Sequence, residues 1–188
     1  MPQPIRKFTL ALHLGSSVGW IGAAFAYLAV VAVLMSSRDL TMRRDTIGLM
    51  NSIDWFVMMP MAYTALLTGV VIALATPWGL FRHWWVLLSL LLTVGAVLIL
   101  TEYSLGIRSL AAAIAAGPTL DQQELAKLNR AGSGDLVHNV FGLGVLLAIT
   151  VLNVYKPRGL TRYGWNKQRD LRRKAMQQRS RTAAESRA

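Results

Sequence analysis

The sequence contains no cysteine, and few of its residues are charged. Without cysteine, the chain has no disulfides, zinc–thiolate sites, iron–sulfur clusters or cysteine catalysis. Only 15% of the 188 residues are charged, against about 25% in a typical soluble domain. The sequence also has no nucleophile elbow, phosphate-cradling loop or His-Glu-x-x-His motif. It therefore leaves open whether the protein is an enzyme.

Long apolar stretches dominate instead, and 54% of the residues are hydrophobic. A helix rises about 1.5 Å per residue and the hydrocarbon core is about 30 Å thick, so about 20 residues cross a bilayer. We expect one domain over residues 1–158, an all-α integral membrane four-helix bundle. Its membrane-spanning helices are expected at about residues 8–35, 55–78, 84–102 and 137–155.

The first apolar stretch has a signal peptide as its alternative interpretation. Arg6 and Lys7 precede the stretch, and Ala24-Phe25-Ala26 imitates a cleavage site. Apolar sequence continues from Tyr27 to Leu34, beyond that site. We therefore interpret the stretch as a retained helix.

Prolines, glycines and the helical pattern predict where the other spans bend, extend and end. Pro60 lies inside the second span and predicts a kink or a wider first turn. Helical pattern continues past Glu102, so an extended third helix is expected to project from the membrane, up to a break at Gly117-Pro118. Capping-box spacing then predicts a short outer helix over residues 119–131, followed by a turn at Gly132-Ser133-Gly134.

The charges predict the orientation of the spans. Of the twenty Lys and Arg residues, eleven lie in the last 33 positions, mostly in a basic tail over residues 159–188. With both termini inside, the inner segments hold 14 of the twenty and the outer loops hold 6. Because cytoplasmic loops carry the excess of Lys and Arg, we expect an N-in/C-in topology in a bacterial cytoplasmic membrane.

The basic tail directly follows an apolar helix, which favours anionic lipid headgroups over nucleic acid as its partner. It has few large apolar residues, and we expect disorder beyond Gln178.

Histidines inside a membrane are functional hypotheses because buried polar groups are costly there. His13 and His83 lie toward the inner ends of the first and third spans, where they could bracket a haem or a metal ion. The alternative for His83 is an interfacial residue among tryptophans. His138 lies near the outer face, at a depth roughly 20 Å from His13, so these two are not expected to share one iron.

Two further metal hypotheses concern the outer half. Asp54, Glu102 and His138 all fall at span ends and could bind a divalent ion, with helix-end capping as the alternative. Six of the eight methionines lie within 27 residues, and Met58 and Met61 share a helix face at i, i+3. Thioethers suit Cu(I), although methionine also packs irregular apolar space around a proline.

The first span reads Leu12-His13-Leu14-Gly15-Ser16-Ser17-Val18-Gly19-Trp20-Ile21-Gly22. This motif resembles a group of small bacterial integral membrane proteins of unknown function, related to CopD-like copper-resistance membrane domains and HemJ-type protoporphyrinogen oxidases. In the HemJ-type enzymes, the first-helix histidine is associated with haem b together with a lysine on a later helix. His13 matches that histidine, but no lysine occurs within any span here. The CopD-like resemblance implies copper handling.

Three functions follow as hypotheses. The first is a membrane protein that binds haem or a metal ion, with His13 as its ligand. The second is a non-catalytic accessory subunit that associates with a larger membrane complex through its basic tail and glycine faces such as Gly15 and Gly19. A homo-oligomer is the alternative to such a membrane-protein partner. The third is a haem-dependent oxidoreductase.

Overall fold

The structure is a computed structural model of the chain, and it describes residues 2–76, 79–117 and 122–185. These residues form helices throughout, apart from short connections and one isolated bridge between His83 and Leu160. The elements are α1 (Gln3–Ser36), α2 (Leu40–Ile53), the π-helix η1 (Asp54–Met58), α3 (Met59–Ala75), α4 (Trp84–Ala116), α5 (Gln122–Tyr155) and α6 (Arg162–Glu185).

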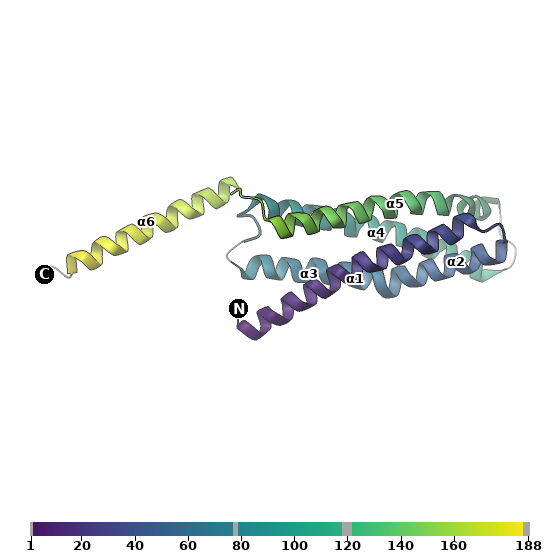
Figure 1. Cartoon of the computed structure of the whole chain (residues 1–188), viewed down its shortest axis with the longest axis horizontal. Coiled ribbons are helices and arrows are strands. Elements are labelled where there is room, and N and C mark those ends of the chain that lie inside the picture. The colour runs from purple at the N-terminus through teal and green to yellow at the C-terminus, as the bar shows by residue number, and fades with distance from the viewer. Residues whose placement is uncertain (1, 77–78, 118–121, 186–188) are drawn as a thin grey trace.

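Four rods make up the bundle, because α2, η1 and α3 run on as one helix from Leu40 to Ala75. The rods lie side by side in alternating directions, and the N-terminus and the start of α6 lie at the same end of the bundle (Figure 1). We call this the proximal end, and the end with the α1–α2 connection the distal end. Each rod is long and apolar enough to cross a membrane.

The segment before the second span is helical and leaves only a short connection after α1. A carboxylate oxygen of Asp39 accepts a hydrogen bond from the backbone N–H of Thr41 at 3.0 Å, which caps the first turn of α2. The wider turn expected near Pro60 is confirmed, since η1 ends two residues before it. Proline has no N–H to donate within the helix, so the preceding turn can widen at little cost.

The expectation of a separate outer helix and a glycine turn is wrong. The first residues of that expected helix, 119–121, lie outside the described residues, but α5 continues without interruption from Gln122 through Gly132-Ser133-Gly134. A Cβ on Gly132 would lie 2.7 Å from Cγ of Met35. This glycine therefore allows α1 and α5 to approach closely. The extended third helix is confirmed, because α4 runs to Ala116.

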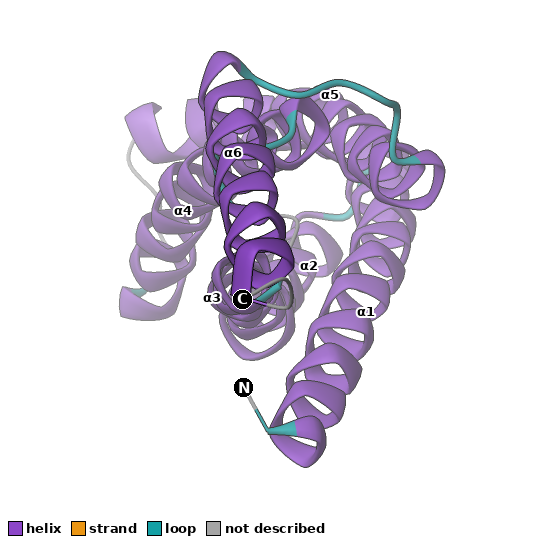
Figure 2. Ribbon diagram, turned by 90° about the vertical axis from the view of Figure 1, so that its left-hand side faces the viewer, coloured by secondary structure: helices purple, strands orange, loops and turns teal. Residues whose placement is uncertain are grey.

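The first helix packs unevenly along its length. From Trp20 onward one residue in every three or four is buried, in the order Trp20, Ala23, Ala24, Tyr27, Val31 and Leu34. Before that point most side chains are exposed, and α1 inclines away from its neighbours toward its N-terminus (Figure 2). The helix is therefore held firmly in the distal half and by few contacts in the proximal half.

Helix α6 extends away from the bundle at the proximal end (Figure 1). It is helical up to Glu185, so the expected disorder beyond Gln178 is wrong. Its sequence is rich in Arg, Lys, Gln and Ala, which are strong helix formers even without tertiary contacts. Its four large apolar side chains, Tyr163, Trp165, Leu171 and Met176, are all exposed.

Candidate functional site

The imidazole of His13 is fixed against α3 in the proximal half. Its Nδ1 lies 3.0 Å from the carbonyl oxygen of Ala65 and 3.1 Å from Oγ1 of Thr68. The Thr68 hydroxyl donates its own proton to the carbonyl of Thr64, so its oxygen accepts from His13. Nδ1 therefore carries the ring proton, and Nε2 keeps its lone pair and has no hydrogen-bond partner among the described residues.

Gly69 allows this close contact between the ring and α3. A Cβ at Gly69 would lie 3.1 Å from Cε1 of His13. One turn earlier, the Ala65 carbonyl receives the ring proton. An imidazole with one nitrogen held by a backbone carbonyl and the other open has the arrangement that metal-ligating histidines adopt.

His83 lies at the proximal end, directly before α4. Its backbone forms the bridge to Leu160, and its ring centroid lies 6.5 Å from that of Trp85. The structure therefore places His83 at the same end of the bundle as His13, beside a tryptophan. The joint role of the two histidines stays a prediction.

The outer trio of sequence-predicted residues falls in different surroundings. Asp54 is 3% exposed, whereas Glu102 points to the surface. His138 stacks on Tyr103, with ring centroids 3.8 Å apart and planes 6° from parallel. Within residues 2–76, 79–117 and 122–185, no group of three His, Asp or Glu side chains is arranged to hold a metal ion. Arg108 lies over the ring of Trp55 at 4.4 Å.

The two methionines have different neighbours. Met58 is buried and lines a cavity, while Sδ of Met61 lies 3.1 Å from the position of a Cβ on Gly19. Gly19 therefore serves close packing between α1 and α3 inside the chain. Copper binding by the methionines stays a prediction.

A pair of buried carboxyl groups is the feature that the sequence did not single out. Asp135, on α5, is 4% exposed, and it interacts electrostatically with the buried Asp54 and with the hydroxyl of Tyr27. Ser104 is fully buried, and its hydroxyl has no hydrogen-bond partner among the described residues. Neither carboxyl group forms an ion pair with a described residue. Two acids inside a membrane helix bundle mark a polar layer in an otherwise apolar core.

The register of the helices explains why these groups lie near one another. The helices α1 and α5 run antiparallel (Figure 1), and a Cβ at Gly132 would lie 3.8 Å from Cδ2 of Leu34. Seven residues along each helix from there are Tyr27 and Asn139, which therefore lie at the same depth. Asp135 lies between these levels. Helical spacing of the buried positions Leu128, Asp135, Asn139, Leu143 and Leu146 was the signal that could have identified it.

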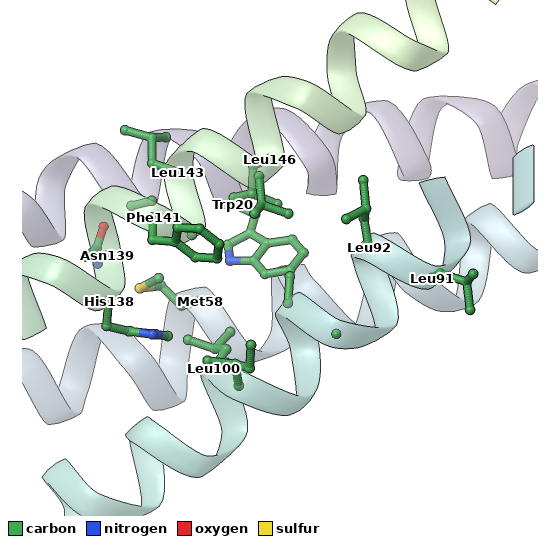
Figure 3. Close-up of a pocket in the computed structure, with 16 residues that line it drawn as sticks. Trp20, Met58, Leu91, Leu92, Leu100, His138, Asn139, Phe141, Leu143 and Leu146 are labelled. Atoms are coloured by element: carbon green, nitrogen blue, oxygen red, sulfur yellow. The ribbon is translucent and has the colours of Figure 1, made fainter. Parts of the chain in front are cut away.

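A cavity of about 210 Å³ lies between α4 and α5, with Trp20 of α1 and Met58 of η1 also lining it (Figure 3). Its lining is almost entirely apolar apart from His138 and Asn139. The amide oxygen of Asn139 is buried and has no hydrogen-bond partner in the described part of the chain. The cavity thus has one polar corner in an apolar space.

Four apolar rods of membrane length define the chain as a multi-pass membrane protein with an all-α, four-helix bundle. No protein-family model, no curated protein and no solved structure matches the chain.

Proposed function

We propose that this membrane protein binds haem b, which Nε2 of His13 would hold through its iron. The observation that carries the proposal is the hydrogen bond from Nδ1 of His13 to the carbonyl oxygen of Ala65, 3.0 Å long. It fixes the tautomer, orients the ring and leaves the second nitrogen available for coordination. The resemblance of the motif around His13 to haem-associated first helices points to the same residue.

The contacts of His13 hold its ring in place. The ring lies half-buried against α3, where Gly69 presents no side chain. His83, at the same end of the bundle, is the proposed second ligand. A bound haem b supplies one-electron redox chemistry, and the residues of this chain bind and orient it.

An absorption spectrum of the protein purified in detergent tests the proposal. We expect a Soret band in the wild type and in His138→Ala, whose ring lies in the distal half. His13→Ala should lose the band, while helix content measured by circular dichroism stays unchanged. A wild-type protein that remains colourless after incubation with haemin overturns the proposal. So does a His13→Ala variant with an unaltered Soret band, and so does a sample that contains copper but no haem.

We further infer that both termini face the cytoplasm of a bacterium. Support comes from the basic residues of the proximal end, where α6 alone carries eight of the twenty Lys and Arg residues. Reporter tags on the two termini should both give cytoplasmic signals, and signals from opposite sides contradict the topology. The tail should bind vesicles that contain anionic lipids, and it should not bind vesicles of neutral lipids.

An accessory subunit of a larger membrane complex is the second candidate function, and α6 favours it. This helix extends beyond the bundle with Leu171 and Met176 exposed, 50% and 72% respectively. Such a helix offers a surface to another protein. Native electrophoresis of mildly solubilised membranes tests this function. We expect a complex larger than the chain alone, lost on truncation after Arg158. Migration as a single copy excludes this function.

A further inference from the structure

The cavity beside Trp20 opens onto the surface that faces lipid. Three of its lining residues, Leu91, Ile99 and Phe141, are 61%, 46% and 69% exposed, although they belong to apolar membrane helices. Its back wall is the buried indole of Trp20. A ligand can therefore enter sideways from the hydrocarbon phase, and a water-soluble molecule is disfavoured.

Two glycines keep this space open. Gly95 of α4 and Gly142 of α5 both line the cavity, and a Cβ on either would meet no atom within 4 Å. These glycines are therefore not required for close helix packing, in contrast to Gly132. Larger side chains at these two positions would occupy the cavity without pushing the backbone.

Polar groups without partners gather at one corner. Figure 3 shows the indole nitrogen of Trp20 on the side of the ring that faces His138 and Asn139. Neither this N–H nor the ring nitrogens of His138 form a hydrogen bond with the described residues. The buried amide oxygen of Asn139 also lacks a partner there. In a membrane such groups are costly unless a ligand pairs with them.

The chemistry of the corner discriminates between occupants. A saturated acyl chain would fill the apolar part but would leave the N–H donors unpaired. A quinone ring is flat, so it can lie against an indole, and its oxygens accept hydrogen bonds from N–H groups. The hydroxyl of its reduced form can donate to the oxygen of Asn139. Both the apolar wall and the polar corner then have a matching part of the ligand.

We propose that the cavity between α4 and α5 binds a membrane-dissolved quinone, with its ring against Trp20 and its oxygens toward His138 and Asn139. This site lies nearer the distal end than His13 and does not depend on the haem proposal. The residues that would contact the quinone, Trp20, His138 and Asn139, have no role in the proposed haem site.

Tryptophan fluorescence of the detergent-solubilised protein, titrated with decylubiquinone, tests the proposal. We expect saturable quenching in the wild type and at least tenfold weaker binding in Gly142→Leu, whose new side chain fills the cavity. Gly144→Leu is the matched control, because Gly144 also has open space around its Cβ position but does not line the cavity. It should bind like the wild type.

Further variants distinguish the loss of cavity space from the loss of hydrogen bonds to the ligand. Gly95→Leu fills the cavity from α4, and it keeps the test valid if Gly142→Leu fails to fold. His138→Leu keeps the space but removes a hydrogen-bonding group, and we expect about tenfold weaker binding, which corresponds to one lost hydrogen bond. Equal affinity in both glycine variants and the wild type overturns the proposal. Displacement of bound decylubiquinone by an equal concentration of decane also overturns the proposal, because the site would then select only for an apolar chain.

Discussion

The proximal and distal halves of the bundle hold their histidines in different ways. In the proximal half, His13 is fixed edge-on by two acceptors on α3, and one ring nitrogen stays open. In the distal half, His138 lies flat on Tyr103 and its ring nitrogens make no hydrogen bond with a described residue. A ring held by its nitrogen is oriented for coordination, whereas a ring held by its face keeps both nitrogens for a ligand in the cavity.

The two halves also differ in what holds α1. Distal contacts are dense and depend on Gly132, whereas proximal contacts are few and include the hydrogen bonds of His13. Stability should therefore be more sensitive to changes in the distal half, and the proposed ligand binding by His13 should be more sensitive to changes in the proximal half. Variants in each half test this difference.

The largest effect is expected from Gly132→Val. Its side chain would have to displace Met35, which lies 2.7 Å from the Cβ position. Overpacking of this kind costs about 1–3 kcal/mol in the free energy of unfolding, measured by denaturation in mixed micelles. Gly134→Val is the matched control, since Gly134 has no neighbour within 4 Å of its Cβ position. Equal stability of the two variants would mean that α1 does not depend on this contact.

An intermediate effect is expected from Asp54→Asn. Asp54 is buried near Asp135, and no described cation compensates the two acids. Asparagine has no ionised form to bury beside a second acid, so the free energy of unfolding should rise, by about 1 kcal/mol. Asp45→Asn changes an exposed acid on the same rod and should have no effect. A clear loss of stability in Asp54→Asn would show that the carboxyl group serves a bound ion.

The smallest effect on stability is expected from Thr68→Val in the proximal half. The variant keeps the shape of the side chain but removes the oxygen 3.1 Å from Nδ1 of His13. A hydrogen bond between membrane helices contributes about 0.6 kcal/mol, so the change in unfolding should be slight while the Soret band shifts. Thr93→Val, which loses only a bond within its own helix, is the control. An unchanged absorption spectrum in Thr68→Val would mean that the Thr68 hydroxyl does not influence the proposed haem site.

Much of the fold could be predicted from the sequence, and the failures have a common cause. Hydrophobic length identified the four spans, because apolar helices of about 20 residues satisfy their own backbone hydrogen bonds in lipid. The turn assigned to Gly132-Ser133-Gly134 was wrong, because a glycine that breaks a helix in water can instead serve helix contact in a membrane bundle. That error placed Asp135 in a loop and concealed the buried acid pair.

The sequence alone was enough to predict a helical, multi-pass chain with a basic C-terminal tail, because hydropathy and charge act along the chain. It also identified His13 as the polar residue to explain in the first span. The packing of the helices was needed to show which nitrogen of His13 is held, that Asp54 and Asp135 lie near one another, and that Gly142 faces a cavity rather than a neighbouring helix. These properties depend on the register between antiparallel helices, which packing fixes and local sequence does not.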